Sequence, residues 1–156
     1  DQDVHATMGG AVSGDNYRNV LFRNPGQEAN WIKLKLTGNE SNRAAIGARV
    51  TLTVSTADGP RSIYRTVGSG GSFGANPFRL EVGIGKADAV QRVEVQWPAS
   101  GAKQSFENLM ANHAYHIKEG EPSISPLKLK SITLPDPGTT SHSHHGDHGK
   151  DHDHGD

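Results

Sequence analysis

Residues 31–37 read WIKLKLT, and this alternation of apolar and polar side chains decides the fold. Ile32, Leu34 and Leu36 fall on one face of an extended chain, because successive side chains of a strand point to opposite sides. The lysines between them fall on the other face. Trp31 shares the lysine face, so we expect it to pack outside the core, against the preceding segment or a neighbouring domain.

The same period of two recurs along the chain. It is found in residues 50–55 (VTLTVS), 78–84 (FRLEVGI), 93–97 (VEVQW) and 115–117 (YHI). Turn-forming residues separate these segments, and the chain holds 19 Gly and 8 Pro. The pattern predicts an all-β fold, an antiparallel β-sandwich of Greek-key or jelly-roll type with irregular N- and C-terminal extensions. Trp97 continues the apolar face of its strand and is expected in the core.

Composition excludes several classes of function. The chain has no cysteine, which removes disulfides, thiolate catalysis and Cys-ligated metal clusters. Its net charge of −1 is not basic enough to indicate nucleic-acid binding. No apolar stretch approaches the roughly 20 residues of a membrane span.

Four regions follow from these patterns. Residues 27–120 form the sandwich, and residues 1–26 form an N-terminal extension whose segment 17–22 reads as a strand that must pair somewhere. Residues 121–140 are a Pro-rich linker with an edge strand predicted at 127–134. Residues 141–156 are a low-complexity tail of His, Asp, Gly and Ser.

The ordered combination of several segments resembles the ASPIC/UnbV domain. The segments are residues 31–38, 41–50, 68–73, 82–87 and 93–98. That family occurs at the C-terminal end of secreted proteins with FG-GAP (VCBS-type) β-propeller repeats. The resemblance implies a secreted, extracellular or cell-surface location, with the periplasm as the alternative, and brings no catalytic residues.

Residues 19–26 (NVLFRNPG) look like the strand and turn that end a propeller blade. This second resemblance implies an upstream β-propeller in the same precursor, with residues 1–26 left from its last blade. The Asp-rich calcium loops of such repeats are not recognisable in this chain.

Three polar residues around a glycine turn invite a binding interpretation. Asn42, Arg43 and Arg49 could together grip a carboxylate or sulfate, because guanidinium groups bind such anions in bidentate fashion. The alternative is structural: Asn42 caps a turn, Gly47 supplies an unusual backbone angle, and the arginines brace the sheet edge.

Residues 68–74 (GSGGSFG) are expected to form a loop between strands. The loop lacks the Gly-Lys-Ser/Thr ending and the strand-to-helix context of a phosphate-binding loop. Ser69 and Phe73 are its candidates for contact with a ligand or partner, together with Trp31, because exposed loops on a rigid sandwich commonly carry recognition.

The tail concentrates potential metal ligands. Residues 141–156 hold six of the nine histidines and have one Lys against four Asp. Imidazole suits Zn²⁺, Cu²⁺ and Ni²⁺, and neighbouring carboxylates add charge and further acceptors. The predicted ligands are His142, His144, His145, His148, His152, His154, Asp147, Asp151 and Asp153. The alternative is a solvated terminus with incidental metal affinity.

These observations favour a non-catalytic extracellular binding or accessory module whose tail binds a divalent transition metal. No organic cofactor is indicated, and we expect no enzyme activity. A protein partner or self-association is expected, because the strand-like segment before the sandwich has backbone groups to satisfy. The alternative function is therefore a structural self-assembly or docking domain of a cell-surface or secreted complex.

Overall fold

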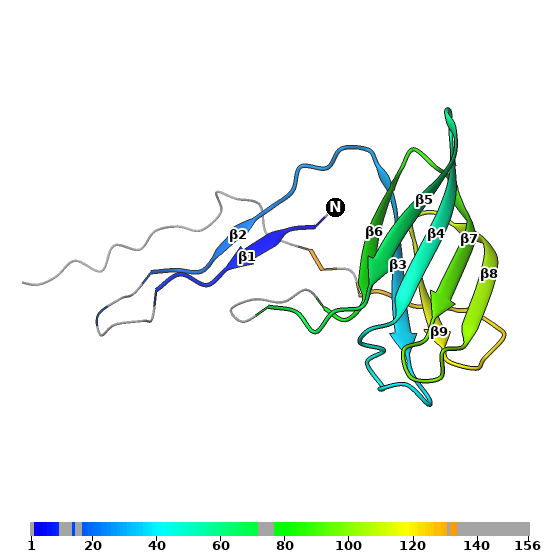
Figure 1. Ribbon diagram of the computed structural model, residues 1–156. Coiled ribbons are helices and arrows are strands. Elements are labelled where there is room, and N and C mark those ends of the chain that lie inside the picture. Colours follow the sequence, from blue (N-terminus) through cyan, green and yellow to red (C-terminus); the bar gives the residue numbers. More distant parts are fainter. Residues whose placement is uncertain (1, 10–13, 15–16, 72–76, 131, 134–156) are drawn as a thin grey trace, which may run out of the picture.

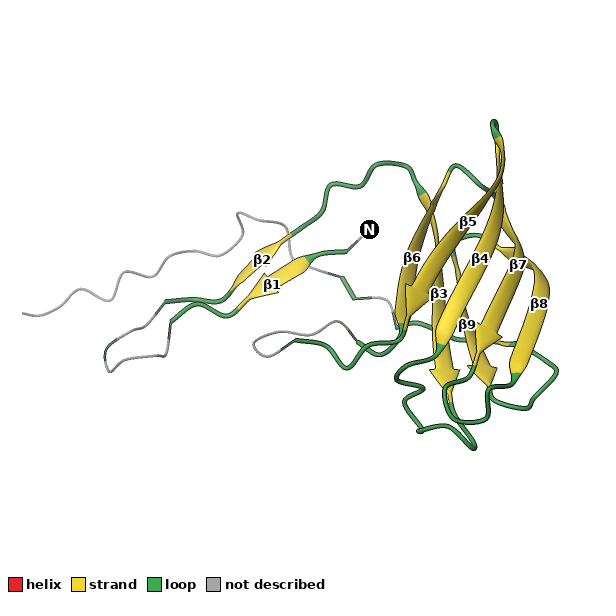
Figure 2. Ribbon diagram, viewed as in Figure 1, coloured by secondary structure: helices red, strands yellow, loops and turns green. Residues whose placement is uncertain are grey.

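Two four-stranded sheets pack face to face in the computed structural model of the protein (Figure 1). The structure describes residues 2–9, 14, 17–71, 77–130 and 132–133. The described residues contain strands and loops and no helix (Figure 2), which confirms the prediction of an all-β sandwich.

The strands divide into two main sheets and a separate hairpin. The first sheet has the order β10 (Ser125–Pro126), β9 (His113–Lys118), β3 (Asn30–Thr37) and β6 (Leu80–Gly85). The second sheet has the order β5 (Gly59–Thr66), β4 (Arg49–Thr56), β7 (Ala89–Gln96) and β8 (Lys103–Met110). The hairpin pairs β1 (Val4–Ala6) with β2 (Val20–Phe22).

The apolar residues of the alternating segments lie in the core, and the polar residues between them lie at the surface. Ile32 and Leu34 are fully buried and Leu36 is 4% exposed, whereas the lysines between them lie outside the core. Alternate residues of β4 and β7 bury their side chains from the second sheet against this face. Trp97, directly after β7, is 1% exposed, which confirms its predicted place in the core.

One strand pair differs from the antiparallel prediction. β3 pairs with β9 in parallel register, from Ile32 opposite His113 to Thr37 opposite Lys118. Between these two strands the chain forms β4 and β5 in the second sheet, β6 in the first, and β7 and β8 in the second. It then returns as β9 beside β3, in the same direction. The period of two is the same for either direction, so the sequence pattern could not distinguish them.

The prediction of an edge strand at residues 127–134 is wrong for the described part of that range. The short strand β10 lies ahead of it, where Ser125 and Pro126 pair with His116 and Tyr115. The amide of Leu127 donates to the Ala114 carbonyl at 2.8 Å, and none of the later described residues is in a strand. The alternating leucines do not extend the pairing because Leu129 is already 41% exposed and has no core to face.

The segment predicted as a strand at 17–22 is partly a strand, and its partner lies within the N-terminal extension. β2 pairs antiparallel with β1, with Val4 opposite Phe22 and Ala6 opposite Val20. Sequence reasoning missed β1 because three residues in a polar, Gly-rich stretch are too few for a period to show.

A tight turn after β3 carries the chain from the first sheet to the second. A side-chain carbon on Gly38 would collide with the Asn42 carbonyl oxygen and lie 2.6 Å from that of Ser41. The Ala45 amide donates to the Asn42 carbonyl at 2.7 Å, so the obstructing backbone is itself held in place. Only glycine fits at position 38.

We expect Gly38→Ala to lower the free energy of unfolding by about 1–3 kcal/mol, the usual cost of overpacking. Urea denaturation monitored by Trp fluorescence measures it. Gly83→Ala is the matched control, because nothing lies within 4 Å of the added carbon there. Equal stability losses in the two variants would contradict the steric explanation.

Candidate functional site

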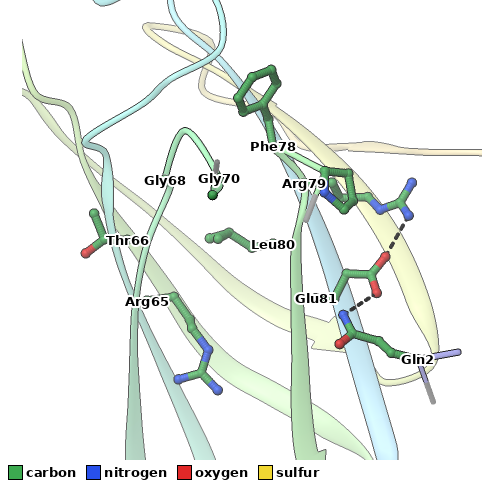
Figure 3. A pocket seen from close by; sticks show the side chains of 11 residues that line it. Gln2, Arg65, Thr66, Gly68, Gly70, Phe78, Arg79, Leu80 and Glu81 are labelled. Carbon is green, nitrogen blue, oxygen red and sulfur yellow. Dashed lines mark hydrogen bonds and ion pairs between the residues drawn. The ribbon is translucent and has the colours of Figure 1, made fainter. Parts of the chain in front are cut away.

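A groove lies where the edge strands of the two sheets, β5 and β6, are joined by the Gly-rich loop. Its volume is about 440 Å³. Leu80 lies between Thr66 and the loop on one side and the chain entering β6 on the other (Figure 3). The lining residues labelled there are Gln2, Arg65, Thr66, Gly68, Gly70, Phe78, Arg79, Leu80 and Glu81.

Glu81 is the polar centre of this groove. Its carboxylate accepts hydrogen bonds from Arg79 Nη2 at 2.6 Å and from Gln2 Nε2 at 2.7 Å, and Lys33 Nζ lies at 3.3 Å. Burial of the carboxylate raises its pKa, but the contacts with Arg79, Gln2 and Lys33 together outweigh burial and bring the pKa to about 2. Glu81 is therefore ionised at neutral pH and joins the N-terminal segment to β6.

A second carboxylate, Glu119, directly follows β9 and is 6% exposed. It accepts the amides of Asn39 and Ser41 at 2.7 Å each, and the hydroxyls of Ser41 at 2.8 Å and Ser100 at 2.6 Å. Burial raises the pKa of Glu119, but the donors from Ser100, Ser41 and Asn39 lower it to about 2. All four donors stabilise the ionised form, so this Ser/Glu cluster holds loops together.

The two histidines of β9 have local partners. His113 Nδ1 lies 2.7 Å from the Ala111 carbonyl, and His116 Nε2 lies 2.9 Å from Thr37 Oγ1. Desolvation lowers the pKa of His116, and the nearby Lys35 and Lys118 lower it further while Glu121 raises it. No group of three His, Asp or Glu side chains able to hold a metal ion is found within the described ranges.

The structure places the predicted binding residues in different settings. Asn42 forms two hydrogen bonds with the backbone of Ile46, at 2.8 and 2.9 Å, and Gly47 has φ +93°. Asn42 therefore caps its own turn and Gly47 supplies the unusual backbone angle, as the structural alternative predicted. Arg43 is exposed in the same loop, whereas Arg49 is on β4 and lines a groove of the second sheet.

Trp31 lies outside the core, as its position in the alternation predicts. It lines a groove of about 260 Å³ with residues of the preceding segment, among them Gln2, Asn24 and Ala29. Lys33 Nζ lies 5.1 Å from the centroid of the Trp31 ring. Ser69 belongs to the loop beside the Glu81 groove, while Phe73 lies outside the described residues. All nine predicted metal ligands of the tail, residues 142–154, also lie outside them.

Sequence reasoning missed the Glu81 cluster. Arg79 and Glu81 are two apart on an expected strand and must share a face, so the pair could have been found. The contact with Gln2 could not have been found, because 79 residues separate the partners.

The fold defines the chain as a two-sheet β-sandwich domain, and the hydrogen-bonded carboxylates of Glu81 and Glu119 serve its structure. The chain belongs to the ASPIC and UnbV family, whose profile matches residues 38–124. A search of curated proteins finds no match.

One similar crystal structure is that of a protein from Bacteroides ovatus ATCC 8483, described as a proposed cell adhesion protein. It is 18% identical, with a TM-score of 0.29, over 69% of this chain and 46% of that chain. This chain therefore spans less than half of the length of that structure. In the described part of this chain, no helix is long and apolar enough to cross a membrane.

We expect acid to destabilise the protein through Glu119 and Glu81. The pKa of each is about 2 in the folded protein against an ordinary 4.5, so the unfolded chain binds more protons between these values. The stabilisation is complete above about pH 5 and is lost as pH falls toward 2. Glu119→Gln should lower the urea midpoint at pH 7 and reduce, without abolishing, the decline between pH 5 and pH 2.

Glu121→Gln serves as the control, because that carboxylate is exposed and, among the described residues, pairs only with Lys118. Urea titrations at pH 7, 5, 4 and 3 provide the comparison. An unchanged acid decline in Glu119→Gln would show that the buried carboxylate does not carry the linkage.

Proposed function

We propose that this chain is a non-catalytic binding module of a secreted or cell-surface protein, and that it docks through its N-terminal hairpin. The observation that carries the proposal is the composition of one hairpin face. The register places Val4 opposite Phe22 and Ala6 opposite Val20, and residues two apart on a strand share a face. All four side chains of that face are apolar.

This apolar face lacks cover from the described residues. Val4 is 60% exposed and Phe22 is 59% exposed, and the hairpin ribbon extends away from the sandwich (Figure 1). An isolated two-stranded hairpin is marginally stable in water, and its outer edges have unpaired backbone groups. The hairpin therefore gains stability by joining another sheet.

The proposed occupant of this face is the preceding sheet of the same precursor, a β-propeller to which residues 1–26 would contribute. The family assignment of residues 38–124 and the blade-like sequence of residues 19–26 support it. A second copy of the chain is the alternative occupant, because the same apolar face could pair with itself in a symmetric dimer.

We expect limited proteolysis of the 156-residue chain alone to cut within residues 1–26 first and to leave the sandwich intact. The same segment should be protected when the upstream part of the precursor is joined to it. Phe22→Ser should abolish that protection, and Leu21→Ser, on the opposite face, should not. Full resistance of the hairpin in the isolated chain would contradict the need for a partner.

Light scattering distinguishes the two occupants. Self-assembly is supported if the isolated chain is a dimer both with and without chelator and the Phe22→Ser variant is a monomer. A monomer supports docking on the upstream sheet.

The state of the two perturbed carboxylates supports a non-catalytic role. A general acid or base needs a pKa near the working pH, whereas Glu81 and Glu119 have pKa values of about 2. Their oxygens are occupied by the donors already described. Both groups therefore support folding rather than proton transfer.

We further propose that the tail binds Zn²⁺, Cu²⁺ or Ni²⁺. The support is the spacing of six histidines among aspartates in residues 142–154. Metal-assisted hydrolysis needs a fixed ligand set with an open position. The irregular spacing of these residues in the sequence does not match such a set and suits capture of a metal.

Calorimetric titration with Zn²⁺ and Cu²⁺ should show binding by the full chain and none by a chain ending at residue 140. Binding should weaken as pH falls below about 6.5, because imidazole must be neutral to coordinate a metal. The shortened chain keeps His5, His113 and His116 and is thus an internal control. Equal binding by both chains would contradict the assignment to the tail.

A further inference from the structure

The outer face of the second sheet aligns polar side chains in rows across four strands. Direct register partners form each row, so their side chains stand side by side on one face. One row is Tyr64, Thr51, Glu94 and Ser105, and the next is Thr66, Arg49, Gln96 and Lys103. The alternate residues of the same strands face the core.

A shallow groove of about 250 Å³ runs over these two rows. We call it the outer groove; the side chains that form it on this face are Arg49, Thr51, Tyr64, Thr66, Glu94, Gln96 and Lys103. Tyr64 is 70% exposed. The volume of the outer groove is slightly below the range of small-molecule sites, about 300–1,000 Å³, which suits one unit of a chain that continues over the open face.

The polar groups of the outer groove have no partners among the described residues. None of its seven side chains takes part in a hydrogen bond or an ion pair there. One row further along the same face, Arg92 and Glu107 do pair, at 3.4 Å. The groove thus presents donors and acceptors that are open to a ligand.

This combination of groups matches a sugar better than a protein surface. An exposed aromatic ring has a negative face that attracts the polarised C–H groups on one side of a pyranose. Arg49 and Lys103 donate hydrogen bonds, Glu94 accepts them, and Gln96 does both, as sugar hydroxyls require. The two rows contain no aliphatic side chain, whereas the buried centre of a protein interface is apolar.

The charge of the outer groove selects among sugars. Arg49 and Lys103 outnumber the single carboxylate of this groove, Glu94. A guanidinium binds a carboxylate or sulfate in a bidentate manner that a neutral sugar cannot exploit.

We propose that the outer groove binds an acidic oligosaccharide, with Tyr64 stacked on a sugar ring and Arg49 and Lys103 holding its carboxylate or sulfate groups. This inference rests on the proposed role as a binding module and names a ligand class for it. It involves neither the hairpin nor the tail, so the experiments on those parts can fail independently.

Calorimetric titration of the full chain with three oligosaccharide probes tests the proposal. The probes are oligogalacturonate for carboxylate, dextran sulfate for sulfate, and neutral dextran. Chelator is present throughout to silence the tail. We expect binding of at least one acidic probe, weakening as salt rises, and no binding of neutral dextran. The acidic probe that binds identifies the group recognised.

Two pairs of variants separate a site from general charge attraction. Tyr64→Ala should weaken binding about tenfold, the loss expected for one aromatic contact, and Tyr64→Phe should retain it. Tyr17→Ala, at a tyrosine that is 73% exposed on the N-terminal extension, should have no effect. Arg49→Gln should weaken binding about tenfold, and Arg43→Gln should not.

Three results would overturn the proposal. The first is no binding of either acidic probe at millimolar concentration, which would leave the face to a protein partner. The second is equal binding of neutral dextran. The third is an equal loss in the Arg43→Gln and Arg49→Gln variants, which would assign the binding to net charge. Because all substitutions are at exposed positions, unchanged urea midpoints verify that each variant is folded.

Discussion

The carboxylate of Glu119 is the constraint on which one end of the sandwich depends. It follows β9 and binds the backbone and hydroxyl of the turn that leaves β3, and the hydroxyl of Ser100 in the loop between β7 and β8. The Ser41 hydroxyl in turn accepts the Ala99 amide at 3.2 Å. One buried charge thus fixes the turn between the sheets to a loop of the second sheet. Removing it would leave several buried donors unsatisfied, which costs more than the loss of a single hydrogen bond.

The period of two in the sequence was sufficient to predict the sandwich, because it specifies which side chains are buried whatever the strand order. Ile32, Leu34 and Trp97 are in the core as their positions require. The period does not specify the direction of a strand or the strand with which it pairs. The parallel pairing of β3 with β9 depends on how the chain returns from the second sheet. The pairing of β1 with β2 depends on a contact between short segments, which no local pattern encodes.

The candidate sites were less predictable than the fold, and the reason is sequence separation. Asn42 holds its own turn through Ile46, four residues away, and sequence reasoning could weigh that structural role directly. The donors to Glu119 from the β3–β4 turn are 78 to 80 residues away, and Gln2 reaches Glu81 across 79. Tyr64, Thr51 and Glu94 stand in one row only because two strand registers align them. Such neighbours exist once the sheet is assembled, so no reading of local spacing can find them.

The outward faces of the two sheets differ in how their charges are used, and this difference separates two kinds of contact. On the first sheet, Glu81 pairs with both Arg79 and Lys33, and Trp31 is bordered by residues of the preceding segment. Glu81 and Trp31 are thus already engaged with the N-terminal extension. On the second sheet, the polar groups of the outer groove have no such partners among the described residues. A partner sheet joined to the hairpin would therefore leave the outer groove free, because the two surfaces draw on different strands. The module could then hold its neighbour and a ligand at the same time, without either displacing the other.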